Sequence, residues 1–94
     1  MRVFVVERYL PATGAHDLVP IAERDRRAAA SMAGTGVAVR HLTCIHVPSD
    51  EFCYSLFAAP SAEDVRRAHE RAGIGFDRIV EAIQVTSTEG GTGR

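Results

Sequence analysis

The sequence predicts an α+β domain with the order β-α-β-β-α-β, which is the order of a ferredoxin-like sandwich. Three observations predict it. Four short stretches are rich in β-branched and aromatic residues, which is typical of strands. Two longer stretches space their apolar residues by three and four, which is typical of amphipathic helices. The 94 residues suffice for one domain with one modest core. We therefore expect a four-stranded antiparallel sheet with both helices on one face.

The first strand is expected over Arg2 to Tyr9, where valines surround Phe4 on both faces. A helix follows from Asp17 to Ala33. Asp17 would cap its amino end, so the nearby proline falls in the first turn, where it is tolerated. One stripe of this helix is apolar and would face the sheet. Its members are Leu18, Ile21, Ala22, Ala28, Ala29 and Met32.

A β-hairpin is expected next, with strands at Val37–Val47 and Phe52–Ala59 flanking the turn-forming residues Pro48–Glu51. The sequence leaves its register open. A four-residue turn places His46 opposite Cys53 with Cys44 on the same face. A five-residue loop places His41, Thr43 and Cys53 on one face instead, because a shift of one residue moves every side chain to the other face.

The second helix is expected from Ser61 to Ala72, with Ser61 as its cap and Gly73 as its end. The last strand follows over Arg78 to Thr86. The domain would thus span residues 1–86, and the glycine-rich residues 87–94 would form a disordered tail. The outer face of the predicted sheet is also apolar. The economical cover for such a face is a second copy of the same sheet, so we expect a homodimer.

Composition excludes several classes of function. The formal net charge is −1, and arginines are interleaved with acids, so a nucleic-acid partner is not expected. No stretch approaches the roughly 18 apolar residues of a membrane span. The first residues run directly from an apolar stretch into charge without a cleavage site, so a signal peptide is not expected. We therefore expect a cytoplasmic protein whose two cysteines are reduced thiols.

The hairpin holds the side chains best suited to bind a metal. Thiolate and imidazole are ligands for nickel, zinc, copper or iron. Neither cysteine belongs to a C-x-x-C pair, so a ribbon-type zinc site is excluded. A disulfide is not expected, because the cysteines would be diagonal or on opposite faces. The alternative without a metal is that these residues only pack in the core. The four side chains are His41, Cys44, His46 and Cys53.

Two acids form a second group of candidates. Glu7 and Glu81 lie on the first and last strands, which should be antiparallel neighbours. One alternative is a salt bridge to Arg8, Arg40 or Arg78, or exposure at a strand end, because a carboxylate in an apolar strand needs a partner or water. The other alternative is an oxygen ligand or a general base.

Several segments together resemble a known family of small bacterial proteins, catalogued as a domain of unknown function, whose members are often named nickel-binding proteins. The resemblance covers the chain to about Val85. It implies a ferredoxin-like fold, a homodimer, and nickel or another divalent metal as ligand. By position, Glu7, His41, Cys53 and Glu81 match the family's recurrent polar residues, whereas Cys44 and His46 do not. The matching segments are FVVERYLP at 4–11, His41, CYSLFAAPS at 53–61, and RAG at 71–73 leading to FDRIVE at 76–81.

The sequence thus supports three hypotheses. The first is a dimer that stores, buffers or senses nickel, with His41, Cys53 and Glu7 or Glu81 as ligands. The second is a cofactor-free isomerase or oxygenase, in which His41 and Glu7 act as acid and base in a cavity between sheet and helices. The third is a purely structural dimerisation module. No activated nucleophile with a base and an orienting group is evident, which favours the first hypothesis.

Overall fold

The computed structural model describes residues 1–11 and 19–85, and within them the predicted order of elements is confirmed. A 3-10 turn, η1 (Pro48–Asp50), joins the two hairpin strands. The other elements in order are β1 (Arg2–Tyr9), α1 (Val19–Ala30), β2 (Arg40–Val47), β3 (Phe52–Ala59), α2 (Ala62–Ala72) and β4 (Arg78–Ala82).

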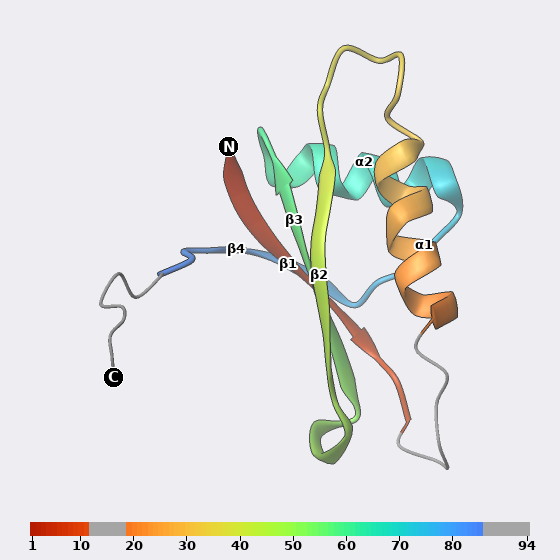
Figure 1. The fold of residues 1–94 in the computed structure, drawn as a ribbon, viewed down its shortest axis with the longest axis vertical. Helices are drawn as coiled ribbons and strands as arrows, with labels where there is room; N and C mark the ends of the chain where they lie inside the picture. Colours follow the sequence, from red (N-terminus) through yellow and green to blue (C-terminus); the bar gives the residue numbers. More distant parts are fainter. Residues whose placement is uncertain (12–18, 86–94) are drawn as a thin grey trace.

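The four strands form one antiparallel sheet in the order β2-β3-β1-β4. Both helices lie on the same side of this sheet (Figure 1). Phe4 and Phe57 from the central strands pack in one core with Met32 after α1 and with Val65 and Ala68 of α2. The structure is therefore the two-layer arrangement that the element order predicts.

The two faces of the sheet differ in burial. On β1, Phe4, Val6 and Arg8 point toward the helices and are buried, whereas Val5 and Glu7 on the other face are only partly buried. The same alternation runs along β3. We call the two sides the helix face and the outer face. Because successive side chains of a strand point to opposite sides, the strand register assigns each pairing residue to one of them.

The hairpin adopts the first of the two predicted registers. His46 pairs with Cys53 across the strands, and Cys44 pairs with Ser55. The turn closes with Glu51 in the left-handed region, at φ 57°. A β-bulge interrupts the pairing at Leu42, between His41 and Thr43. As a result, His41, Cys44, His46 and Cys53 all belong to the helix face, because the bulge restores His41 to that side.

Some element boundaries differ from the predictions. β2 begins at Arg40 rather than Val37, because Arg40 is its first residue with a partner on β3. β4 ends at Ala82 rather than Thr86, since its pairing with β1 stops there. α1 ends at Ala30 and turns follow it. The predicted cap Asp17 and the predicted tail at 87–94 lie outside the described residues.

Helix α2 has the predicted ends. The Asp64 backbone N–H donates to the Ser61 hydroxyl, which satisfies one of the orphan donors at the amino end. Gly73 ends the helix in the left-handed region at φ 71°, where glycine has no Cβ penalty. These ends fix the helix so that His69 faces the sheet and is buried. Neither described helix is long and apolar enough to cross a membrane.

Candidate functional site

A cluster of polar side chains lies buried between the helices and the sheet. Arg8 of β1, Asp25 of α1, Ser55 of β3 and His69 of α2 are all at most 7% exposed. The His41 side chain of β2 joins them at 12% exposure. Five elements thus contribute to one polar group of residues inside an otherwise apolar core. Buried charge is costly unless it is paired and hydrogen-bonded, so the contacts within this cluster determine its stability.

Arg8 is the centre of the cluster. Its Nη1 lies 3.0 Å from Asp25 Oδ1 and donates to the Ser55 hydroxyl at 3.2 Å. Its Nη2 lies 2.6 Å from His69 Nε2, and its Nε donates to the Gly75 carbonyl at 3.0 Å. The guanidinium therefore has a partner in four directions, one of them a carboxylate that balances its charge.

The contacts of His69 determine its protonation. Its Nδ1 lies 2.8 Å from the Val65 carbonyl, which only accepts, so Nδ1 carries the proton and donates. Nε2 then accepts from Arg8, which has only donors to offer. Burial lowers the pKa of His69 below its usual value, and the charge of Arg8 adds to this shift. His69 is therefore a neutral acceptor.

Asp25 lies against three other members of the cluster. The Ser55 hydroxyl donates to Oδ2, and Arg8 pairs with Oδ1. His41 Nε2 lies 3.4 Å from Oδ2, and the His41 ring packs on Phe57 with 5.2 Å between ring centroids. The carboxylate is fully buried. These contacts of Asp25 are all with other side chains of the cluster, which is the organisation of a structural ion pair.

The two cysteines form a second group on the helix face. The Sγ atoms of Cys44 and Cys53 are 2.8 Å apart, and both residues are free thiols. The register makes them diagonal neighbours on one face, which is one of the two placements expected from the sequence. The hydrogen bond from Cys53 lowers the pKa of Cys44 to about 6, and the same bond raises the pKa of Cys53. Cys53 is buried, whereas Cys44 is half-buried.

The four ligands expected from the sequence do not converge. His41 and Cys53 share the helix face, but Glu7 is on the outer face, where its carboxylate pairs with Arg78 at 2.8 Å. Glu81 pairs with Arg2 at 2.8 Å on the edge strand β4. Within residues 1–11 and 19–85, no three His, Cys, Asp or Glu side chains are grouped so that they could hold a metal ion.

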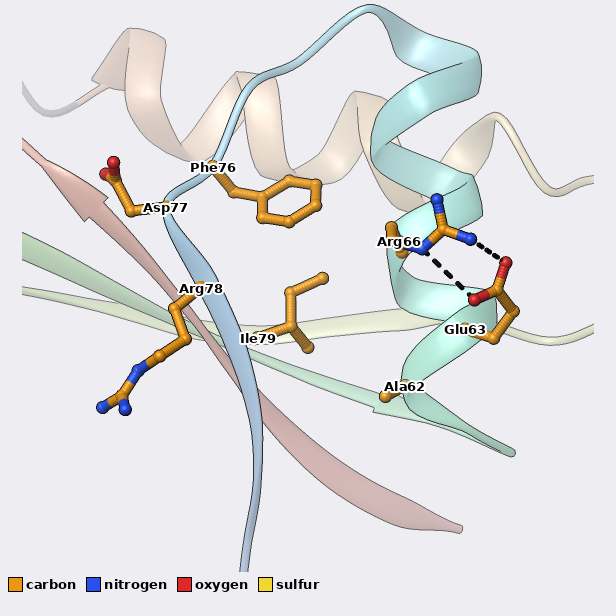
Figure 2. Close-up of a pocket in the computed structure, with 7 residues that line it drawn as sticks. All are labelled: Ala62, Glu63, Arg66, Phe76, Asp77, Arg78 and Ile79. Atoms are coloured by element: carbon orange, nitrogen blue, oxygen red, sulfur yellow. Dashed lines mark hydrogen bonds and ion pairs between the residues drawn. The ribbon is translucent and has the colours of Figure 1, made fainter.

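The acid–base pair of the enzyme hypothesis does not form either. Glu7 and His41 lie on opposite faces of the sheet, so they cannot act together on one substrate. A hollow of about 330 Å³ does lie between α2 and β4. Figure 2 shows Phe76 and Ile79 pointing into it and Arg78 pointing away. Neither Glu7 nor His41 lines this hollow, so it does not support the enzyme hypothesis.

Sequence reasoning missed three members of the buried cluster. Asp25 is four residues after Ile21 and three before Ala28. This spacing places it in the apolar stripe and could have predicted that Asp25 is buried. Ser55 is two residues after the buried Cys53, so the alternation of a strand places both on the same buried face. Arg8 was considered only as a salt-bridge partner for Glu7 or Glu81. Its burial depends on α1 and α2, which lie far away in the sequence and leave no local pattern around Arg8.

The fold and these side chains define a class: a small ferredoxin-like α+β protein with thiol and imidazole groups gathered on one hairpin. The profile of the nickel responsive protein SCO4226-like family matches residues 4–82. The chain belongs to this family. The crystal structure of SCO4226 from Streptomyces coelicolor A3(2) is similar, with 26% sequence identity and a TM-score of 0.66. The similarity covers 89% of this chain and 99% of that one. No curated protein matches the chain.

The first prediction concerns the buried ion pair. Replacing Asp25 with Asn keeps the shape of the side chain but leaves the Arg8 charge buried without a counter-ion. We expect the free energy of unfolding in urea to fall by about 3–5 kcal/mol. Glu23→Gln is the matched control, because Glu23 pairs with Arg26 on the exposed side of the same helix and its loss should change little. Equal effects of the two substitutions would contradict the structural role of Asp25.

The second prediction concerns pH. The pKa of His69 in the folded protein is below its value in the unfolded chain, so the unfolded chain binds this proton more readily. The stability that His69 contributes is therefore present above about pH 6.5 and is lost as the pH falls through its folded pKa. Nitrogen-15 NMR of the imidazole should show a ring with its proton on Nδ1 that stays neutral to a lower pH in the folded protein than in the urea-unfolded chain. Titration of His69 near its value in the urea-unfolded chain would contradict this.

Proposed function

We propose that the protein is a cytoplasmic dimer that binds exchangeable nickel in a storage, buffering or sensing role. The observation that carries the proposal is the helix face of the β2–β3 hairpin. It gathers two thiols and two imidazoles, the donors that suit nickel and related divalent metals. Membership of a nickel responsive family supports the choice of nickel over zinc. The four donors are His41, Cys44, His46 and Cys53.

Thiols and imidazoles suit nickel, but no single point of the described chain brings three or more possible ligands together. Cys44 contacts Cys53, and His41 contacts Asp25, so the potential ligands of the described chain come in pairs. A resident cofactor needs a closed set of ligands held in place, and these residues do not present one. For this reason we propose exchangeable binding and not a catalytic metal centre.

His41 and Cys53 are the proposed ligands within this hairpin. They would bind nickel at separate points, because His41 is opposite Phe57, which lies four residues after Cys53 along β3. Both come from the helix face, and His41 lies near its solvent edge at 12% exposure. A role of Glu7 and Glu81 as oxygen ligands remains a prediction from the sequence. Each already has an arginine partner, and a metal would have to compete with that ion pair.

The outer face of the sheet supports the proposal of a dimer. Apolar side chains from all four strands lie on this face, and they are only partly buried or exposed in one chain. A two-fold axis through such a face would pair each residue with the same surface of the partner. The thiols and His41 lie on the opposite face, so the dimer would not cover them. The apolar residues are Val3, Val5, Ile45, Tyr54, Leu56 and Val80.

Nickel binding is tested by calorimetry on reduced, chelator-stripped protein without a tag. We expect a dissociation constant of micromolar or tighter, about −8 kcal/mol, with release of protons as thiols and imidazoles bind metal. His41→Ala and Cys53→Ser should each weaken binding by roughly tenfold or more, since each removes a ligand. Glu23→Gln, an acid on the exposed side of α1, should leave binding unchanged. Absence of heat with nickel and with zinc would rule the proposal out.

The dimer is tested by sedimentation. We expect the mass in solution to be twice the 10.2 kDa of one chain. Leu56→Arg places a charge in the middle of the outer face and should yield monomers, because a buried unpaired charge opposes association. Ala33→Arg is the control, as Ala33 is exposed beyond the end of α1. A monomeric wild-type protein, or a dimer that tolerates Leu56→Arg, would refute this interface.

A further inference from the structure

The two thiols meet although their residues are not paired. Cys44 is opposite Ser55, and Cys53 is opposite His46, so the cysteines are diagonal neighbours on the helix face. Diagonal neighbours in an untwisted sheet are too far apart for their sulfur atoms to meet easily. The right-handed twist of a hairpin brings the two ends of one diagonal closer together. In this structure the two sulfur atoms lie 2.8 Å apart.

We propose that Cys44 and Cys53 are a reversible oxidation site, at which a hydroperoxide converts the two thiols into a disulfide within one chain. First, the sulfur of Cys44 attacks the peroxide and the O–O bond breaks. Cys44 becomes a sulfenic acid, and one water (an alcohol, for an alkyl hydroperoxide) leaves. Then the sulfur of Cys53 attacks that of Cys44. The S–O bond breaks, and the oxygen leaves as water with the thiol proton. The thiols lose two electrons in total, and the peroxide gains them.

Exposure sets the order of the two steps. Cys44 is half-buried on the edge strand β2, so a peroxide can reach it, whereas Cys53 is only 2% exposed on the interior strand β3. Once Cys44 is oxidised, its resolving partner is already in contact. The sulfur atoms then need to move less than about 1 Å closer to reach bonding distance. The sequence holds no other cysteine that could compete within the chain.

The site remains available in the proposed dimer. Both cysteines lie on the helix face, and the proposed dimer uses the outer face. The oxidation itself needs no metal and does not depend on the proposed function. One consequence does rest on that function: a disulfide would withdraw Cys53 as a nickel ligand and so couple nickel binding to the redox state.

The test uses the full chain, reduced and freed of metal by a chelator, and treated with hydrogen peroxide. We expect the intact mass to fall by two hydrogen atoms and both thiols to become unreactive toward a maleimide. Non-reducing peptide mapping should join the peptides of Cys44 and Cys53. The rate should not depend on protein concentration, and a dithiol reductant should restore both thiols. Because no metal is present, these results stand whether or not the reduced protein binds nickel.

Three variants separate this chemistry from simple thiol oxidation. Cys53→Ser should halt at the sulfenic acid of Cys44, which dimedone traps. Cys44→Ser should leave Cys53 at least about tenfold less reactive than Cys44, because Cys53 is buried. The double change Thr43→Cys with Cys44→Ser keeps two cysteines but moves one to the outer face. This matched control should form no disulfide within the chain.

Several results would overturn the proposal. One is a disulfide that forms only between chains, seen as a rate that rises with protein concentration. Another is oxidation of Cys44 to sulfinic acid while Cys53 keeps its thiol in the wild-type protein. A third is a disulfide in the Thr43→Cys, Cys44→Ser control that forms as fast as in the wild type. That result would show that chain flexibility, and not the contact, brings the sulfur atoms together.

Discussion

The ion pair between Arg8 and Asp25 is the constraint on which the arrangement of this small domain depends. Two opposite charges at most 7% exposed are tolerable because they pair with each other and because the guanidinium also has polar partners. Those partners come from α1, from β3, from α2 and from the loop at Gly75. Helix α1 must therefore place Asp25 over the sheet, and α2 must place His69 beside it. These hydrogen bonds and the ion pair add a directional requirement to the apolar packing of the two helices.

The same ion pair limits where the protein can do chemistry. Asp25, Ser55 and His69 are the kinds of residue that act as acids, bases or nucleophiles in enzymes, yet here each is occupied by Arg8 or by another member of the cluster. His41, at the border of the cluster, and Cys44, on the edge strand β2, are more exposed than the cluster, and the buried Cys53 is in contact with Cys44. This division between a closed interior and a reactive hairpin is why metal binding and thiol oxidation, rather than catalysis in a cavity, are the proposed activities.

Much of the fold was predictable because local patterns and the global fold agree. Alternating and continuous apolar stretches gave the strands, spacing of three and four gave the helices, and Ser61 and Gly73 gave the ends of α2. The register of the hairpin was open by one residue, and only the turn at Pro48–Asp50, with Glu51 in the left-handed region, decided it. The ends of β2 and β4 depend on where their partner strands stop pairing, which no local pattern contains.

The site was less predictable than the fold. Glu7 and Glu81 were expected near each other on neighbouring strands. In the strand register, however, Glu81 is opposite Phe4, a helix-face residue, so its side chain lies on the face opposite that of Glu7. The contact of the cysteines depends on the register of the hairpin, which the sequence left open. The burial of Arg8 depends on two helices distant in the sequence. In each case the missing information is a long-range register or contact and not the chemistry of the residue.

A double-mutant cycle between Arg8 and Asp25 tests the central claim most directly. The free energy of unfolding would be measured in urea for Arg8→Met, Asp25→Leu and the double variant. If the two charges depend on each other, each single change leaves a buried charge without its partner, and the double change removes that penalty. The account predicts a coupling energy above about 2 kcal/mol. Additive effects, within about 0.5 kcal/mol, would show that the two charges are independent and would contradict it.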